Sequence, residues 1–110
     1  MNKNIPKSCK VVVIGGGVAG CSTAYHLAKF GWKDTVLLER DVLTSGTTWH
    51  AAGLIGQLGS SATITRLRNY SLNLYKQLEK ETGLSTGLKQ NGSLTVATTL
   101  DRLEELKRQL

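Results

Sequence analysis

The stretch VVVIGGGVAG, residues 11–20, decides how this chain begins to fold. It opens with four β-branched apolar residues, which favour a strand. Glycines follow at once, and glycine is the residue that a tight turn tolerates best. A helical pattern begins within the same ten residues. The stretch therefore predicts a strand, a tight turn and the start of a helix.

The glycines of this stretch fit the GxGxxG pattern of dinucleotide-binding turns. We expect Gly15 to allow the sharp turn off the strand, and Gly17 to let a pyrophosphate approach the backbone. Gly20 would let the helix pack closely on the strand. The amides at the helix start, those of Val18 and Ala19 included, would face the phosphates at the positive end of the helix dipole. The motif alone also fits a glycine-rich turn that binds no ligand.

The sequence around the motif favours the ligand-binding interpretation. Residues 18–30 have a helical pattern that ends at Gly31, and the small residues at positions 20, 24 and 28 form a smooth ridge that can lie on a sheet. A second strand is predicted over residues 35–39. It ends in Glu39, about 20 residues beyond the motif, where a carboxylate accepts hydrogen bonds from a ribose diol. Strand, helix, second strand and acid together predict a dinucleotide-binding βαβ unit.

A run rich in hydroxyl groups and glycine follows Glu39. Residues 44–54 read TSGTTWHAAGL. Its hydroxyl and amide groups are suited to hold phosphate or ribitol oxygens, and its small residues would let the backbone approach a flat ligand. A plain loop is the alternative, but an extended dinucleotide would continue in this direction. The predicted cofactor-binding residues beyond Glu39 are Arg40, Ser45, Gly46, Thr47, Thr48, Trp49, His50, Ala51, Ala52, Gly53 and Leu54.

The second half of the chain predicts two helices and a hairpin. An amphipathic helix is expected over residues 62–80, capped by Ser60 or Ser61 and ended by Gly83. Two short strands are expected over residues 88–90 and 93–98, joined by an Asn-Gly turn. A last helix is expected over residues 100–110, with Thr98 and Asp101 as its capping box.

Composition narrows the function classes. The chain has 110 residues, a formal net charge of +6 and a pI near 9.6, yet its basic residues are scattered along predicted helices and aromatic residues make up 5% of it. We therefore expect no nucleic-acid partner. No stretch reaches the roughly 18 apolar residues of a membrane span. Cys9 and Cys21 lack metal-ligand spacing and are expected to be free thiols.

The expected organisation is a short lead, residues 1–10, followed by the N-terminal part of a larger domain over residues 11–110. The lead is too short for a cleavable targeting peptide, so a bacterial-type cytoplasmic location is expected, or the mitochondrial matrix for a processed eukaryotic enzyme. A doubly wound nucleotide domain needs more strands than this chain supplies. We therefore expect the rest of the domain to lie beyond Leu110.

From residue 11 onward, the chain resembles the N-terminus of the dimethylglycine and sarcosine dehydrogenase group of FAD-dependent amine oxidoreductases. Four motifs carry the resemblance: VVVIGGGVAG at residues 11–20, VLLER at 36–40, TSGTTWHAAGL at 44–54 and QNGSLTVATT at 90–99. The third motif is the most specific of them. The resemblance implies an α/β fold, in which a Rossmann-like FAD-binding βαβ unit begins a D-amino-acid-oxidase-like fold that is truncated here.

The resemblance also implies how FAD is held. The adenine half would lie on the glycine turn, with Glu39 on the adenosine ribose. In the dehydrogenases of this group, the histidine of the TWHAAG-like motif is joined covalently to the flavin, and the matching residue here is His50. A neutral imidazole is a suitable nucleophile for that bond. The alternative is that His50 only packs against the isoalloxazine ring.

The reaction implied is the oxidation of N-methyl amines such as dimethylglycine or sarcosine by hydride transfer to the flavin. Oxygen or an electron-transfer flavoprotein would accept the electrons, and longer members carry a C-terminal domain that binds tetrahydrofolate. No catalytic acid or base is assigned, and catalytic residues are expected beyond Leu110.

Two other functions stay open at this stage. One is a non-catalytic relative similar to the regulatory subunit of pyruvate dehydrogenase phosphatase. The other is an NAD-dependent dehydrogenase, which is disfavoured because such a protein has no use for the TSGTTWHAAGL run.

Overall fold

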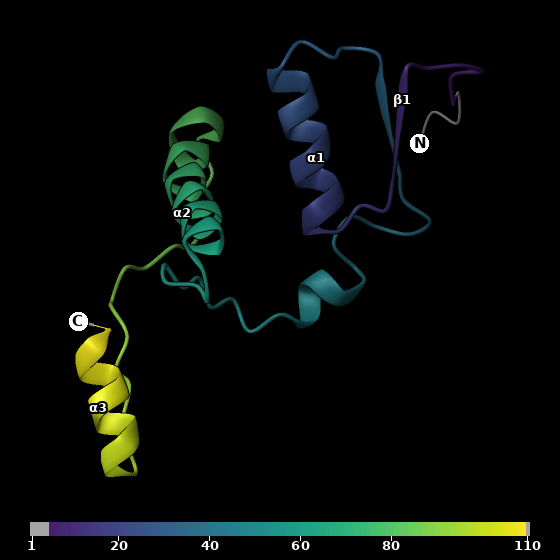
Figure 1. The fold of residues 1–110 in the computed structure, drawn as a ribbon. Coiled ribbons are helices and arrows are strands. Elements are labelled where there is room, and N and C mark those ends of the chain that lie inside the picture. Colours follow the sequence, from purple (N-terminus) through teal and green to yellow (C-terminus); the bar gives the residue numbers. More distant parts are fainter. Residues whose placement is uncertain (1–4, 110) are drawn as a thin grey trace. The chain divides into compact units, whose positions relative to one another are not determined.

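The computed structural model describes residues 5–109, so the predictions for residues 1–4 of the lead and for Leu110 lie outside the described residues. The chain divides into two compact units, Met1–Leu54 and Ile55–Leu110. The elements, in chain order, are β1 (Val11–Ile14), α1 (Val18–Lys29), β2 (Thr35–Leu38), the short 3₁₀ helix η1 (Thr47–His50), α2 (Ala62–Thr82) and α3 (Leu100–Arg108) (Figure 1).

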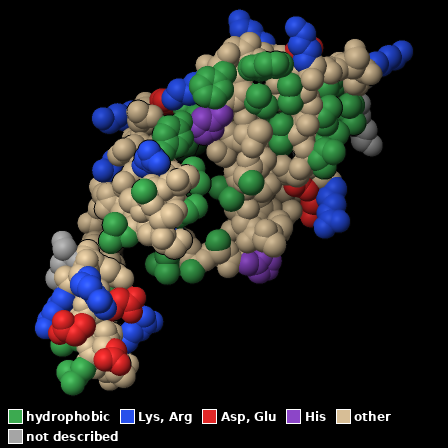
Figure 2. Space-filling view, in the orientation of Figure 1, with side chains coloured by type: hydrophobic (Ala, Val, Ile, Leu, Met, Phe, Trp, Pro, Cys, Tyr) green, Lys and Arg blue, Asp and Glu red, His purple; other side chains and the backbone are tan. Residues whose placement is uncertain are grey.

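The first unit is the predicted βαβ arrangement. Strands β1 and β2 pair in parallel, from Val11 opposite Thr35 to Ile14 opposite Leu38. Helix α1 connects them and packs against both strands (Figure 1). Burial alternates along β1, and Ile14 keeps 86% of its surface exposed. The sheet of the described residues is therefore covered on the face of α1, while apolar side chains remain on the molecular surface (Figure 2).

The ends of α1 and β2 follow the sequence signals closely. Helix α1 stops one residue before the expected end, with Phe30 as its C-cap, and Gly31 then takes a positive φ of 87°. A residue with a side chain adopts that conformation at a cost, so glycine suits the position. Strand β2 ends at Leu38 and leaves Glu39 directly after its carboxyl end.

In the second unit, α2 matches its predicted start and stop signals. The backbone amide of Ile64 donates to the Ser61 hydroxyl at 3.3 Å, so Ser61 is the N-cap. The helix ends at Gly83, whose φ of 70° is left-handed and whose amide donates to the Glu79 carbonyl. Leu72 is the buried apolar residue of the described chain, at 6% exposure.

The predicted hairpin is wrong. None of the described residues between α2 and α3 forms a strand. A two-residue hairpin turn of the Asn-Gly type needs positive φ at both central residues, and Gly92 has one but Asn91 does not. Leu94 and Val96 are 91% and 75% exposed, so the segment lacks the apolar contact that a short hairpin requires.

The predicted cap of the last helix is shifted by one residue. The Thr99 hydroxyl, and not that of Thr98, accepts the amide of Arg102 at 3.3 Å. Asp101 then lies in the first turn, where its charge favours the helix dipole without closing a capping box. Acidic and basic side chains alternate over the surface of α3 (Figure 2), and Lys107 pairs with Glu104 at 2.8 Å.

Two remaining expectations concern cysteines and membranes. Cys9 and Cys21 are both free and partly buried, as expected. Within the part of the chain that the structure describes, no helix combines the length and apolarity needed to cross a bilayer.

Candidate functional site

The glycine turn has the geometry that its sequence predicts. Gly15 has a φ of 103°, and its amide continues the ladder of β1 by donating to the Leu38 carbonyl at 2.8 Å. A Cβ added at Gly20 would lie 1.8 Å from the Gly15 carbonyl oxygen. The close approach of α1 to the end of β1 therefore requires a bare backbone at position 20.

Gly16 occupies a variable position of the GxGxxG motif, but it has a structural role in this site. It is buried, and a Cβ there would lie 2.6 Å from Leu43 and 3.0 Å from the Cβ of Glu39. Its amide donates to the Glu39 carboxylate at 2.6 Å, and its carbonyl accepts the amide of Thr44 at 2.9 Å. The available signal for this role was the glycine at the variable position between Gly15 and Gly17.

Glu39 is held as an anion beside the glycine turn. The backbone amide of Gly16 lowers the pKa of its carboxyl most, and the amide of Asp41, which donates to Oε1 at 3.1 Å, lowers it further. Hydrogen bonds from amides stabilise the charged form of a carboxylic acid. Because each carboxylate oxygen accepts more than one hydrogen bond, these contacts leave acceptor capacity for a ligand hydroxyl.

The loop after Glu39 returns to the glycine turn. Thr44 takes a φ of 67°, which is uncommon for a residue with a side chain, while its amide bonds to Gly16. Four residues later the Thr48 hydroxyl accepts the amide of Val18, the first residue of α1, at 2.9 Å. A Cβ at Gly17 would lie 3.0 Å from that same hydroxyl oxygen. The loop is thus attached to the turn at two points.

A cleft of about 400 Å³ opens between the turn and the loop, at the carboxyl ends of β1 and β2. It brings together eight of the residues predicted from sequence: Gly15, Gly17, Glu39, Arg40, Ser45, Gly46, Thr47 and Thr48. It also includes residues that sequence reasoning did not name, Ile14, Leu38 and Asp41. Ile14 and Leu38 lie within the quoted motifs but were interpreted as strand residues, and Asp41 follows directly after the VLLER motif.

The other predicted residues do not line this cleft. Val18, Ala19 and Gly20 form the first turn of α1. Trp49 is 72% exposed, and its indole meets the His50 imidazole edge to face. The Nδ1 atom of His50 lies 3.1 Å from the Gly46 carbonyl oxygen. Beyond them the chain is exposed through the remaining predicted residues, Ala51, Ala52, Gly53 and Leu54.

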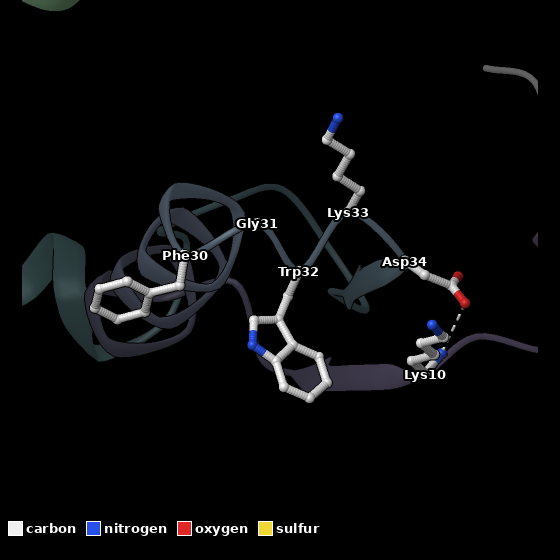
Figure 3. Close-up of a pocket in the computed structure, with 6 residues that line it drawn as sticks. All are labelled: Lys10, Phe30, Gly31, Trp32, Lys33 and Asp34. Carbon is white, nitrogen blue, oxygen red and sulfur yellow. Dashed lines mark hydrogen bonds between the residues drawn. The ribbon is translucent and has the colours of Figure 1, made fainter.

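A second pocket of the first unit, about 380 Å³ in volume, lies at the opposite end of the strands (Figure 3). Its residues follow α1 or precede the two strands, and the backbone amide of Lys10 donates to the Asp34 carboxylate at 3.2 Å. Trp32 lines it, while the Lys33 side chain points away from the indole (Figure 3). Open α/β sheets bind ligands at the carboxyl ends of their strands, so this pocket is not the dinucleotide site.

Comparison with known proteins supplies the family. Residues 10–110 match the family model described as DAO, FAD dependent oxidoreductase. The chain belongs to this family. A crystal structure of glycine oxidase from Bacillus cereus ATCC 14579 superposes with a TM-score of 0.70 at 30% identity, covering 92% of this chain and 29% of that one. The predicted D-amino-acid-oxidase-like fold, with its βαβ start, is confirmed.

Three curated relatives illustrate the range of the family near this chain. Human mitochondrial sarcosine dehydrogenase is 51% identical over 97% of this chain. Rat mitochondrial dimethylglycine dehydrogenase is 48% identical over 92%, and the mouse mitochondrial regulatory subunit of pyruvate dehydrogenase phosphatase is 47% identical over 94%. The chain spans 12% of the length of each of these relatives. The resemblance to the sarcosine and dimethylglycine dehydrogenases is confirmed.

The cleft residues fit the adenosine diphosphate half of FAD, the cofactor of the family. The first turn of α1 presents amides that no preceding carbonyl of the helix can satisfy. Gly17 leaves the space that a Cβ would fill beside Thr48. The Thr48 oxygen accepts the Val18 amide and keeps its own proton to donate. The acceptor capacity left on Glu39 suits a diol, and the volume of about 400 Å³ lies within the usual range of ligand pockets.

Proposed function

We propose that this chain is the FAD-binding part of an oxidoreductase that oxidises N-methyl amines such as dimethylglycine or sarcosine. The observation that supports this proposal most directly is the cleft. It is lined by the glycine turn, Glu39 and the hydroxyl-rich loop, at the carboxyl ends of the strands. The identity of 51% and 48% to sarcosine and dimethylglycine dehydrogenases supports this class of substrate. NAD chemistry is disfavoured by the match to an FAD-dependent family.

In this proposal different residues of the first unit bind different parts of the cofactor. Gly15, Gly17 and the Ala19 amide of α1 hold the diphosphate, while the Val18 amide stays bonded to Thr48. Glu39 accepts hydrogen bonds from the adenosine ribose. Thr47 and Thr48 contribute hydroxyl groups beside the diphosphate. Bound FAD supplies the oxidant, because its ring accepts a hydride from the amine. Oxygen or an electron-transfer flavoprotein would then receive the electrons, and tetrahydrofolate would take the one-carbon unit in a C-terminal domain.

His50 is the proposed residue of covalent attachment. A carbonyl oxygen only accepts hydrogen bonds, so the contact with Gly46 places the imidazole proton on Nδ1. In the neutral ring Nε2 then keeps a lone pair, and the side chain is exposed. Attachment through Nε2 would exchange a C–H bond of the flavin for an N–C bond, with the two electrons kept on the flavin and the proton released to solvent.

A second candidate function is a regulatory relative that keeps the FAD site without oxidising an amine. It is favoured by the 47% identity to the mouse regulatory subunit of pyruvate dehydrogenase phosphatase, a value close to those of the dehydrogenases. Reduction of the flavin by dimethylglycine or sarcosine without oxygen separates the two. Bleaching of the flavin absorbance supports the enzyme, and an unchanged spectrum with both amines supports the regulatory relative.

The test of attachment uses the full-length protein. After denaturation in acid, the flavin is expected to stay with the polypeptide of the wild type and to be released from His50→Ala. Because the diphosphate and ribose contacts remain, His50→Ala should still hold FAD before denaturation. Flavin released from the wild type by acid would refute attachment at His50 without refuting FAD binding.

A further inference from the structure

The N-terminus of α1 is capped by a residue from a distant part of the first unit. The residue at the N-cap position, Gly17, has no side chain and so makes no side-chain cap hydrogen bond. Instead, the Thr48 hydroxyl accepts the amide of Val18 at 2.9 Å, across 30 positions of sequence. Capping by a local Ser, Thr, Asp or Asn is the usual solution, so this contact joins two elements that sequence keeps apart.

The same contact fixes η1, the short helix that carries His50. Thr48 lies within η1, and its carbonyl accepts the amide of Ala51 at 3.2 Å. The other attachment of the loop is the bond between the Thr44 amide and the Gly16 carbonyl, at 2.9 Å. Between the two attachments, Nδ1 of His50 bonds back to the Gly46 carbonyl. These hydrogen bonds therefore fix the position of the His50 imidazole relative to the glycine turn.

We propose that Thr48 is a positioning residue that sets the His50 imidazole relative to the diphosphate site. The proposal rests on the role of His50 proposed above. In FAD, the diphosphate must lie at the glycine turn while the flavin ring lies at His50. The rate of attachment depends on the distance between the His50 nitrogen and the flavin carbon that it attacks. A misplacement of about 1 Å can cost about a hundredfold in rate. Without the Thr48 hydroxyl, η1 would keep the attachment at Thr44 and lose the one nearer His50.

The experiment compares Thr48→Val with Thr48→Ser in the full-length protein. Valine keeps the shape of threonine without the hydroxyl, and serine keeps the hydroxyl. The matched control is Thr23→Val, which removes a hydroxyl of α1 that donates to the Ala19 carbonyl of the same helix at 2.9 Å. The first readout needs no cofactor. Apoprotein is exchanged in deuterated water, and the peptide that contains Val18 is followed by mass spectrometry.

The second readout is the rate of covalent attachment after FAD is added to the apoprotein. In Thr48→Val we expect faster exchange at Val18 and a limiting attachment rate about a hundredfold lower at saturating FAD. Thr48→Ser and Thr23→Val should retain the wild-type limiting rate. Because the Thr48 hydroxyl also lies beside the proposed diphosphate site, its loss should raise the FAD concentration that gives half the limiting rate. The limiting rate at saturating FAD is therefore the readout that reports positioning.

Three results would overturn the proposal. They are attachment by Thr48→Val at the wild-type limiting rate, equal losses in Thr48→Val and Thr48→Ser, and unchanged exchange at Val18 in Thr48→Val. A wild type that never attaches FAD would refute the role of His50 and, with it, this proposal. The failures are distinguishable, because the wild-type measurement judges His50 and the comparison of variants judges Thr48.

Discussion

At the scale of single residues, position 20 sets the tightest constraint in the first unit. In Gly20→Ala the new Cβ would lie 1.8 Å from a backbone oxygen, which cannot move aside as a flexible side chain does. We expect the substitution to destabilise the βαβ unit by ~3 kcal/mol, the upper part of the range for overpacking. The urea midpoint of the full-length protein should fall accordingly.

The control for position 20 is Gly56→Ala. A Cβ at Gly56 would meet only the guanidinium of Arg68, at 3.8 Å, which is ordinary contact. This variant should unfold at the wild-type midpoint or slightly above it, because alanine reduces the entropy of the unfolded chain. Equal midpoints for the two variants would contradict the close approach of α1 to the glycine turn.

At the scale of elements, local signals specify most of the structure and contacts distant in sequence specify the site. The apolar run of β1, the cap at Ser61 and the left-handed Gly83 are each encoded within a few residues, and each was predicted. The bonds from Gly16 to Glu39 and from Val18 to Thr48 join positions 23 and 30 apart, and no local pattern encodes them. The predicted hairpin is absent from the described residues because its signal was purely local. A turn sequence alone does not hold two strands together without apolar contacts to other parts of the structure.

Near the C-terminal end of α2, the Glu79 carboxylate makes a pH-sensitive contact with the residues that follow the helix. Glu79 Oε1 accepts the Thr86 hydroxyl and the Thr86 amide, both at 2.8 Å, and the Ser85 hydroxyl at 3.2 Å. The side-chain bond from Thr86 lowers the pKa of this carboxyl most, followed by the Thr86 amide. A lowered folded-state pKa gives stability that is full above the ordinary value of 4.5 and is lost as the pH falls through the folded-state value.

We therefore expect Glu79→Gln to lower the melting temperature at about pH 7 and to have a smaller effect once the pH has fallen below the folded-state pKa of Glu79, where the wild-type carboxyl is also protonated. Thr86→Val removes the hydroxyl that stabilises the charge, so the two substitutions should be non-additive at the higher pH. Melting temperatures of both single variants and of the double variant measure this coupling. Additive effects at the higher pH would argue against the contact.

At the scale of the whole molecule, the cleft predicts which nucleotides stabilise the protein. If the adenosine diphosphate half of FAD occupies it, ADP alone and FAD should each raise the melting temperature of the full-length apoprotein. A ligand at about 100 times its Kd stabilises the folded state by ~2.7 kcal/mol. NADPH should give no shift at micromolar concentrations, because its 2′-phosphate would meet the Glu39 carboxylate, which hydrogen bonds from two amides hold as an anion.

The Glu39→Gln variant tests whether these melting-temperature shifts come from binding in the cleft. The amide keeps one acceptor oxygen but loses the charge, so the affinity for ADP should fall about tenfold while the repulsion of NADPH disappears. Because Gly16 donates to the wild-type carboxylate, hydrogen exchange at Gly16 reports whether the variant keeps the turn intact. An unchanged ADP shift in a variant with an intact turn would place the adenosine elsewhere. Stabilisation of the wild type by NADPH at micromolar concentrations would show that Glu39 does not select against a 2′-phosphate.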